Sequence, residues 1–213
     1  TIGEEDGHFD YIIAHGVYSW VEPALQDQLL DLCQRNLSDN GVVYISYNVL
    51  PGWHFRGLIA DIMKYHTRAF SDPERKVHQA RAILEFLTDS VAEDTPYGAV
   101  LANEWELLKE KADFYLFHDH LSQFNEPIYF HQFIDRINEK GLQYLGDAEF
   151  DSMVLSEFPD KVVDEIRRVG GSLVRREQYM DFVRNRSFRR SLLVKQKHRL
   201  DHAITWESLK PYN

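Results

Sequence analysis

The chain has almost no cysteine and no long apolar run. Cys33 is its only cysteine among 213 residues, so no disulfide can form within the molecule. A lone thiol at helical spacing with leucines is typical of a buried residue in a reducing compartment, and we expect a cytoplasmic protein. No stretch approaches the roughly 18 apolar residues that a membrane span requires. The acidic opening residues 1–8 are not a signal peptide.

Several catalytic signatures are also missing. No phosphate-binding glycine loop and no serine-hydrolase elbow occurs anywhere in the chain. Ten histidines are present, and the densest group is His118-Asp119-His120, but its spacing matches no common zinc signature. We therefore expect no metal site, and we expect these side chains to serve polar packing.

Charge is acidic overall and unevenly distributed. The net charge is −10, which disfavours non-specific binding to nucleic acid. Residues 165–199 carry 11 basic and three acidic side chains, so this segment is +8 and the remainder of the chain is −18. Two interpretations stay open: the two regions pair inside one fold, or an acidic partner docks on the basic segment.

The hydrophobic pattern predicts a mixed α/β fold. Residues 11–14 and 42–47 are short apolar runs rich in β-formers, and residues 22–37 between them carry helical spacing. This is the spacing of a β-α-β unit with parallel strands. Residues 54–126 show only helical periodicity. After Pro127 a helix, a strand at 142–145, two helices within 159–184 and a last strand at 187–195 follow.

Several stretches, taken in order, resemble a known family. FDYIIAHGVY (9–18) resembles the fourth strand and following loop of class I S-adenosylmethionine methyltransferases, and HQFIDRINEKGLQYL (131–145) is similar to their late helix and sixth strand. The stretches AHGVYSW, ISYNVLPGW, FHDHL, NEPIYFHQF and NRSFRRSLL further resemble bacterial methyltransferases that carry a methyltransferase regulatory domain. Some members of this group methylate lysines of bacterial surface proteins.

The resemblance implies an incomplete class I methyltransferase sheet, Rossmann-like, with the last four strands and a helical insert. Residues 1–55 and 126–198 would form the sheet domain, residues 56–125 a helical regulatory insert, and residues 199–213 a tail or linker. No G-x-G-x-G occurs, although this family binds its cofactor largely through such a turn. We therefore expect the chain to be the C-terminal half of an enzyme. A partner copy, the helices or a preceding segment should cover the open strand edge at residues 10–14.

Candidate site residues follow from the position of the loops. Ligands of open parallel sheets sit beyond the carboxyl ends of the strands, which places residues 15–20 and 47–54 at the pocket rim. The resemblance implies three groups: cofactor contacts from His15, Gly16 and Val17; catalytic groups Tyr18, Tyr47 and Asn48; and substrate contacts from Trp20, Trp53 and His54. Aromatic faces suit a sulfonium or an ammonium. The Asn/Asp-Pro-Pro-aromatic tetrad typical of base-modifying relatives is absent, which argues against a base-flipping enzyme.

Two functional hypotheses result. In the first, the chain carries the substrate side and the regulatory part of an S-adenosylmethionine-dependent methyltransferase, with a protein lysine as acceptor. In the second, it is a non-catalytic helical module for regulation or oligomerisation. The missing glycine loop favours the second for the chain alone, and the retained strand-end loops favour the first for the parent protein.

Overall fold

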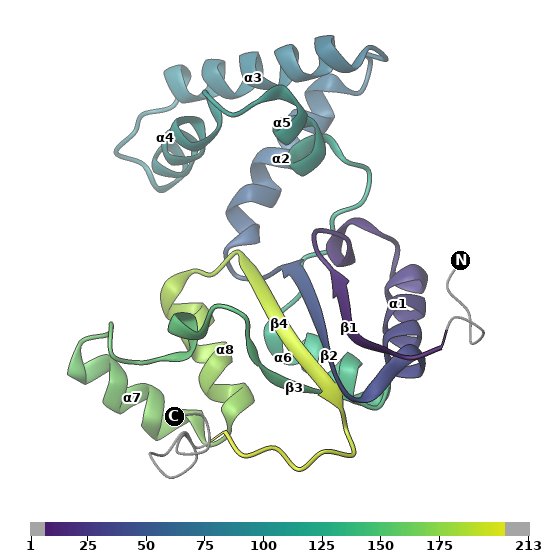
Figure 1. The fold of residues 1–213 in the computed structure, drawn as a ribbon. Coiled ribbons are helices and arrows are strands. Elements are labelled where there is room, and N and C mark those ends of the chain that lie inside the picture. The colour runs from purple at the N-terminus through teal and green to yellow at the C-terminus, as the bar shows by residue number, and fades with distance from the viewer. Residues whose placement is uncertain (1–6, 203–213) are drawn as a thin grey trace.

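A four-stranded mixed sheet forms the base of the molecule in the computed structural model, which describes residues 7–202 (Figure 1). The strands are β1 (Phe9–Ala14), β2 (Leu37–Asn48), β3 (Leu142–Asp147) and β4 (Phe188–Lys195), in the order β1-β2-β4-β3. β1 and β2 are parallel, as the β-α-β spacing predicts, whereas β4 runs antiparallel to both of its neighbours. All four strands expected from the sequence are present, although β2 begins at Leu37, five residues before the expected start.

Two helices cover one face of this sheet. α1 (Pro23–Asn36) follows a single 3-10 turn at Tyr18–Trp20, and α6 (Phe130–Glu139) leads into β3. Their apolar stripes meet the strands in the main core, which includes Leu30 and Cys33 from α1 and Phe133 and Ile137 from α6. The cysteine is buried as expected.

α7 (Asp160–Gly170) and α8 (Leu173–Arg184) follow the 3-10 turn Phe150–Met153 and lie beside β3 and β4 (Figure 1). α8 packs on α6. Its C-cap is Asn185, whose left-handed backbone (φ 50°) turns the chain into β4.

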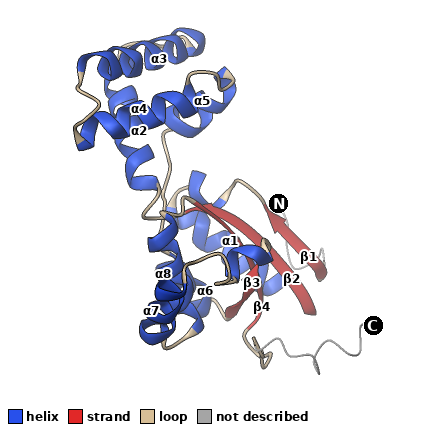
Figure 2. Cartoon of the chain, turned by 90° about the vertical axis from the view of Figure 1, so that its left-hand side faces the viewer, coloured by secondary structure: helices blue, strands red, loops and turns tan. Residues whose placement is uncertain are grey.

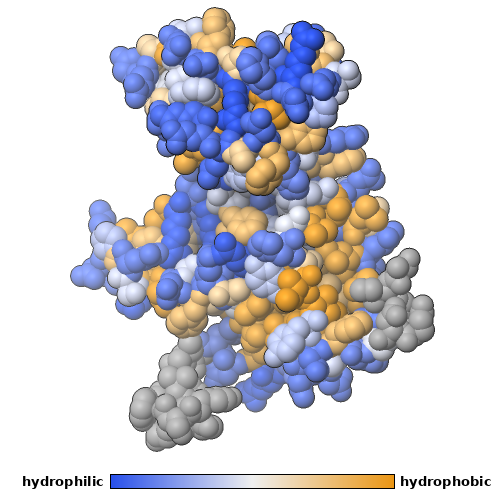
Figure 3. Space-filling model, turned by 45° about the horizontal axis from the view of Figure 1, so that its top comes forward, coloured by the Kyte–Doolittle hydropathy of each residue, from blue (hydrophilic) through white to orange (hydrophobic). Residues whose placement is uncertain are grey.

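The opposite face of the sheet is open. Tyr11 and Ile13 on β1 are 76% and 72% exposed, and they border an apolar hollow of about 580 Å³ that also reaches Tyr44 and Leu192. Figure 3 shows an orange apolar area on the sheet part of the molecule. Within residues 7–202, no helix covers this face or the outer edge of β1, so a covering element would have to be a partner copy or another segment.

A helical lobe stands over the carboxyl ends of β1 and β2. It consists of α2 (Trp53–Thr67), α3 (Pro73–Ser90), α4 (Pro96–Leu108) and α5 (Asp113–Leu121), and it projects from the sheet in both views (Figures 1 and 2). All four helices lie within residues 54–126 except for the first residue of α2, in agreement with the helical periodicity of that range. Asp72 and Thr95 cap α3 and α4 through hydrogen bonds from backbone N–H groups to their side-chain oxygens.

The lobe has a core of its own, separate from the sheet core. Buried side chains from all four helices contribute, among them Ile59, Met63, Leu84, Leu101 and Leu116. No helix among the described residues is long and apolar enough to cross a membrane. Most of the expected tail lies outside the described residues.

Candidate functional site

The loop after β1 presents three of the expected site residues to solvent. His15, Gly16 and Val17 follow the last strand residue and are exposed. Gly16 adopts φ 66°, a left-handed conformation that favours glycine, and a Cβ added there would meet no atom within 4 Å. The loop therefore combines a backbone turn that suits glycine with free space beside it.

Ser46 of β2 holds this loop in place. The Gly16 N–H donates to Ser46 Oγ over 2.8 Å, and His15 Nδ1 lies 3.1 Å from both Ser46 Oγ and the Tyr44 hydroxyl. The imidazole also contacts the Phe188 ring edge-on, at 6.4 Å between centroids. His15 thus lies on the open face of the sheet, between β2 and the start of β4.

Tyr18 and Tyr47 point away from the open face, into the core between the sheet and the helices α1 and α6. Tyr18 is fully buried and accepts a hydrogen bond from Arg136 of α6. Tyr47 is 1% exposed, stacks on Phe133 and shares a hydrogen bond with Ser191. Burial raises the pKa of both phenols. Both hydroxyls are engaged inside the protein, and neither lines an open pocket in the described structure.

Asn48 joins three chain segments. Its side-chain amide donates to Asn125 Oδ1 over 2.9 Å, and its backbone N–H donates to Ser19 Oγ over 2.8 Å. Asn48 is 4% exposed. The last residue of β2 is therefore fixed to the 3-10 turn after β1 and to the segment that returns from the helical lobe.

The two tryptophans meet where the sheet joins the lobe. The Trp20 ring lies 6.0 Å from that of Trp53 and 4.4 Å from that of His118 on α5. Trp53 is 2% exposed, and its indole N–H has no hydrogen-bond partner among the described residues. His54 is exposed and contacts Tyr129 instead. The structure thus brings Trp20 and Trp53 together, whereas His54, in the first turn of α2, contacts Tyr129 at the N-cap of α6.

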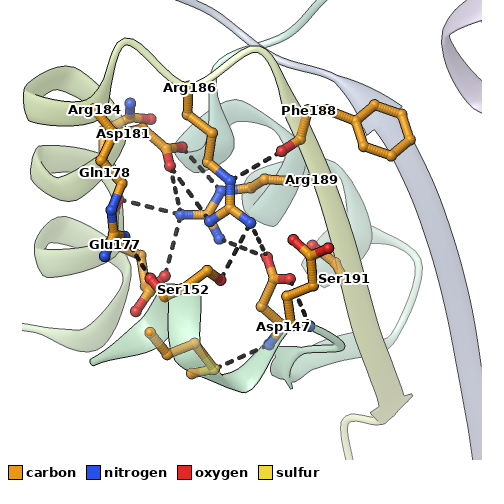
Figure 4. A network of polar contacts seen from close by, with 12 residues as sticks. Asp147, Ser152, Glu177, Gln178, Asp181, Arg184, Arg186, Phe188, Arg189 and Ser191 are labelled. Atoms are coloured by element: carbon orange, nitrogen blue, oxygen red, sulfur yellow. Dashed lines mark hydrogen bonds and ion pairs between the residues drawn. The ribbon is translucent and has the colours of Figure 1, made fainter. Parts of the chain in front are cut away.

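A buried charge network, which the sequence analysis did not identify, lies between β4, β3 and α8 (Figure 4). Arg189 is completely buried and binds Asp181 through two nitrogens, at 2.8 and 2.9 Å, and also Glu177 and Asp147. Its guanidinium lies 3.9 Å above the Phe130 ring. Burial raises the pKa of all three carboxyls. The sequence signal was the basic segment itself, but its pairing pattern cannot be read from composition.

The helical lobe contains no cluster that could hold a metal ion, and the same is true of the other described residues. His118 contacts Asp119 at 2.9 Å. His120 is buried and has no hydrogen-bond partner for either ring nitrogen within residues 7–202.

The fold is shared with a solved protein, and part of the chain matches a family model. Residues 112–195 match the model of the family described as "Predicted methyltransferase regulatory domain". This stretch runs from the start of α5 to the end of β4 and contains the charge network. The family resemblance seen in the sequence is therefore confirmed.

A solved structure with the same architecture is PKMT2 from Rickettsia typhi. It superimposes with a TM-score of 0.85 at 37% identity, over 98% of this chain and 39% of that chain. A second structure of the same protein, in complex with AdoHcy, gives a TM-score of 0.85 at 38% identity, over 97% of this chain and 40% of that chain. The predicted α/β methyltransferase-type fold is confirmed by this match.

A curated relative from the same genus is an uncharacterized protein, RP789 of Rickettsia prowazekii (strain Madrid E). It is 43% identical over 213 residues, which are 100% of this chain and 38% of that protein. The chain thus spans about two fifths of the length of both relatives.

Proposed function

We propose that the protein acts as an S-adenosylmethionine-dependent methyltransferase whose acceptor is a lysine of another protein, and that this chain supplies the acceptor side of the site. One observation carries the proposal: an exposed, glycine-containing loop at the carboxyl end of β1, in a fold shared with a protein solved in complex with AdoHcy. AdoHcy is what S-adenosylmethionine becomes once its methyl group has been transferred.

The residues after β1 fit one side of such a cofactor. Gly16 leaves open space at the loop, the His15 ring is held by Ser46 and Tyr44, and Val17 is 42% exposed. When bound, the cofactor would supply an activated methyl group on a sulfonium, which needs little general-base help. The 213 residues hold no G-x-G-x-G turn, so the remaining contacts would come from elsewhere in the longer protein.

The aromatic residues between sheet and lobe suit an amine acceptor. Trp20 is partly exposed beside Trp53, and aromatic faces attract ammonium groups. A lysine must lose its proton before it can attack, and desolvation next to such rings lowers its pKa. His54 would bind the acceptor at the rim. Because the Tyr18, Tyr47 and Asn48 side chains are engaged internally, we assign them the role of positioning the two loops.

Cofactor binding by this chain is the first test. AdoHcy is titrated into the isotope-labelled chain, and the backbone amide resonances are followed by NMR. We expect shifts confined to His15–Val17 and their Ser46 neighbour, lost in Gly16→Val and retained in Gly57→Val, whose position is equally open but lies in the lobe. Shifts elsewhere, or none at millimolar AdoHcy, would contradict the cofactor contacts.

Methyl transfer to a lysine is tested in a longer protein. A chimera of PKMT2 from Rickettsia typhi is prepared in which this chain replaces the matching segment. Methylation of an added protein acceptor by the chimera is mapped by mass spectrometry. Lysine methylation that disappears with Gly16→Val supports the proposal. Methylation of another residue type contradicts the acceptor class.

A non-catalytic helical module is the second candidate, and one feature favours it. An apolar hollow of about 680 Å³ lies between α3 and α5, next to Phe114, which is 79% exposed. Such a surface could serve oligomerisation. Light scattering of the chain and of Phe114→Asp separates the candidates: self-association through this helix, together with absent AdoHcy binding, would favour the module.

A further inference from the structure

A second hollow lies where the helical lobe meets the start of β4. It has a volume of about 360 Å³ and mixes polar with apolar side chains. Its lining includes Phe55 and Arg56 from α2, Asn103 and Glu104 from α4, and Asn185 and Ser187 from the turn before β4. Its size falls in the range of ligand pockets, which form preferentially at boundaries between structural units.

Glu104 is the unusual member of this lining. Glu104 is only 5% exposed, yet no hydrogen bond or ion pair joins its carboxylate to another residue within the described part of the chain. Burial raises the pKa of this carboxyl, and the positive charge of Arg56 opposes the increase. The Glu104 oxygens are not among the fully buried side-chain atoms that lack a partner, so they stay accessible at the wall of the hollow.

Arg56 does not neutralise Glu104 by direct contact. Its guanidinium lies over the Trp53 ring, 5.7 Å from the centroid. The carboxylate therefore keeps its acceptor capacity for a donor that enters the hollow. Phe55 is 43% exposed at this position, so an aromatic face accompanies the carboxylate.

The hollow adjoins the proposed methyl-transfer site. Ser187 precedes Phe188, whose ring contacts His15, and Gly52 precedes Trp53. Gly52 packs so closely that a Cβ would lie 2.6 Å from the carbonyl oxygens of Asn185 and Arg186. The two sides of the hollow are thus fixed to each other and to the loops of the site.

We propose that this hollow, with the unpartnered Glu104 carboxylate at its wall, binds a basic side chain of the acceptor protein, next to the lysine that is methylated. The inference rests on the proposed function and adds a recognition subsite to it. A lysine side chain brings an alkyl stem for Phe55 and N–H donors for Glu104, in a charge-assisted hydrogen bond.

The test uses two tripeptides, acetyl-Gly-Lys-Gly amide and its norleucine counterpart, titrated into the isotope-labelled chain. We expect the lysine peptide to shift the amides of Asn103, Glu104 and Ser187, and the norleucine peptide to bind at least about tenfold more weakly. Glu104→Gln should cause a similar loss. Glu106→Gln, an exposed acid on the same helix that pairs with Lys109, should change nothing.

A filling variant keeps the test decisive if Glu104→Gln disturbs folding. Ala99 is exposed at the rim, so Ala99→Trp should occupy the hollow without affecting the core, and lysine binding should be lost. Equal binding of both peptides, or binding unchanged by Glu104→Gln, overturns the inference. Shifts confined to residues 15–20 also overturn it but leave the proposed function standing, and AdoHcy binding tests that function independently.

Discussion

Arg136 on α6 donates a hydrogen bond to the hydroxyl of Tyr18, which lies 118 residues earlier in the chain. The same guanidinium also donates to Gln26 Oε1, and the Gln26 amide in turn donates to the backbone carbonyls of Tyr18 and Val21. These bonds hold the 3-10 turn after β1 against α6. We call this set of hydrogen bonds the Arg136 brace. Because the turn carries Trp20, the brace fixes the acceptor side of the proposed site.

Replacing Arg136 by Met should therefore destabilise the chain. The variant keeps an unbranched apolar chain in place of the arginine stem but leaves the Tyr18 hydroxyl and the Gln26 amide oxygen without their donor, and such losses cost about 1–3 kcal/mol. The free energy of unfolding is measured by urea denaturation. Lys140→Met is the control, because Lys140 forms a partly exposed pair with Asp31, which is worth at most about 1 kcal/mol. Equal effects of the two variants would contradict the brace.

Arg189→Met should be more damaging. Removing one partner of a buried ion pair leaves carboxylates without compensation and costs about 3–5 kcal/mol. The neighbouring Arg190 provides a matched control, since it pairs with Glu149 and is 34% exposed. We expect a large loss of unfolding free energy for Arg189→Met and a small one for Arg190→Met. If the two losses are similar, the network does not stabilise the fold as described.

His120 predicts an acid sensitivity of the helical lobe. Burial lowers the pKa of His120 to about 4, whereas an unfolded histidine titrates near 6.5. Between these values the unfolded chain binds the additional proton, so unfolding free energy should rise as pH increases from about 4 to about 6.5 and level off above that. The full difference is about 3 kcal/mol.

The measurement compares pH profiles of unfolding free energy for the wild type and His120→Leu. The raised carboxyl pKa values of the charge network act in the opposite direction, but both proteins contain them, so the difference between the profiles isolates His120. Parallel profiles would show that the imidazole does not titrate differently in the folded protein.

The strands and the parallel β-α-β unit could be predicted from sequence because they depend on local apolar runs at fixed spacing. α5 lies within the helical range 54–126, but its bounds could not be predicted, because Phe114–Phe117 is a continuous apolar run that shows no helical period. The two tyrosines in the predicted site illustrate the limit. Position in a loop sequence indicates that Tyr18 and Tyr47 lie near the strand ends. Only the structure shows that both side chains turn inward, toward Arg136 and Ser191.

The ion pairs of the charge network also could not be predicted from the sequence. Composition revealed an excess of basic residues at 165–199, but partners such as Asp147 come from another strand, and pairings across the sheet depend on register. The hollow beside Glu104 is lined both by α4 and by the turn before β4, which lie about eighty residues apart in the sequence.

The open sheet face should promote self-association of the chain. Ile13→Lys places a charge at a position that is 72% exposed, so unfolding free energy should change by less than about 0.5 kcal/mol while association weakens. Light scattering over a concentration series checks this. Ile12→Lys is the contrasting variant, because Ile12 packs against the main core and its replacement should destabilise the fold. Unchanged association in Ile13→Lys would contradict a role for this face.

Two glycines of the same region should respond oppositely to alanine. A methyl group at Gly52 would meet backbone carbonyl oxygens of Asn185 and Arg186 at 2.6 Å, and backbone cannot move aside as a side-chain tip can. Gly52→Ala should therefore cost about 1–3 kcal/mol and separate α2 from the start of β4. Gly57 lies within α2 with no atom within 4 Å of such a methyl, so Gly57→Ala should stabilise the helix by about 0.5–1 kcal/mol. Gly52 is the N-cap of α2 and Gly57 lies inside the same helix. Thermal unfolding of the two variants therefore distinguishes the effect of the steric contact from the effect of helix propensity. A stable Gly52→Ala variant would mean that the lobe is not clamped to β4, and the Glu104 hollow would then lose the fixed walls on which its selectivity depends.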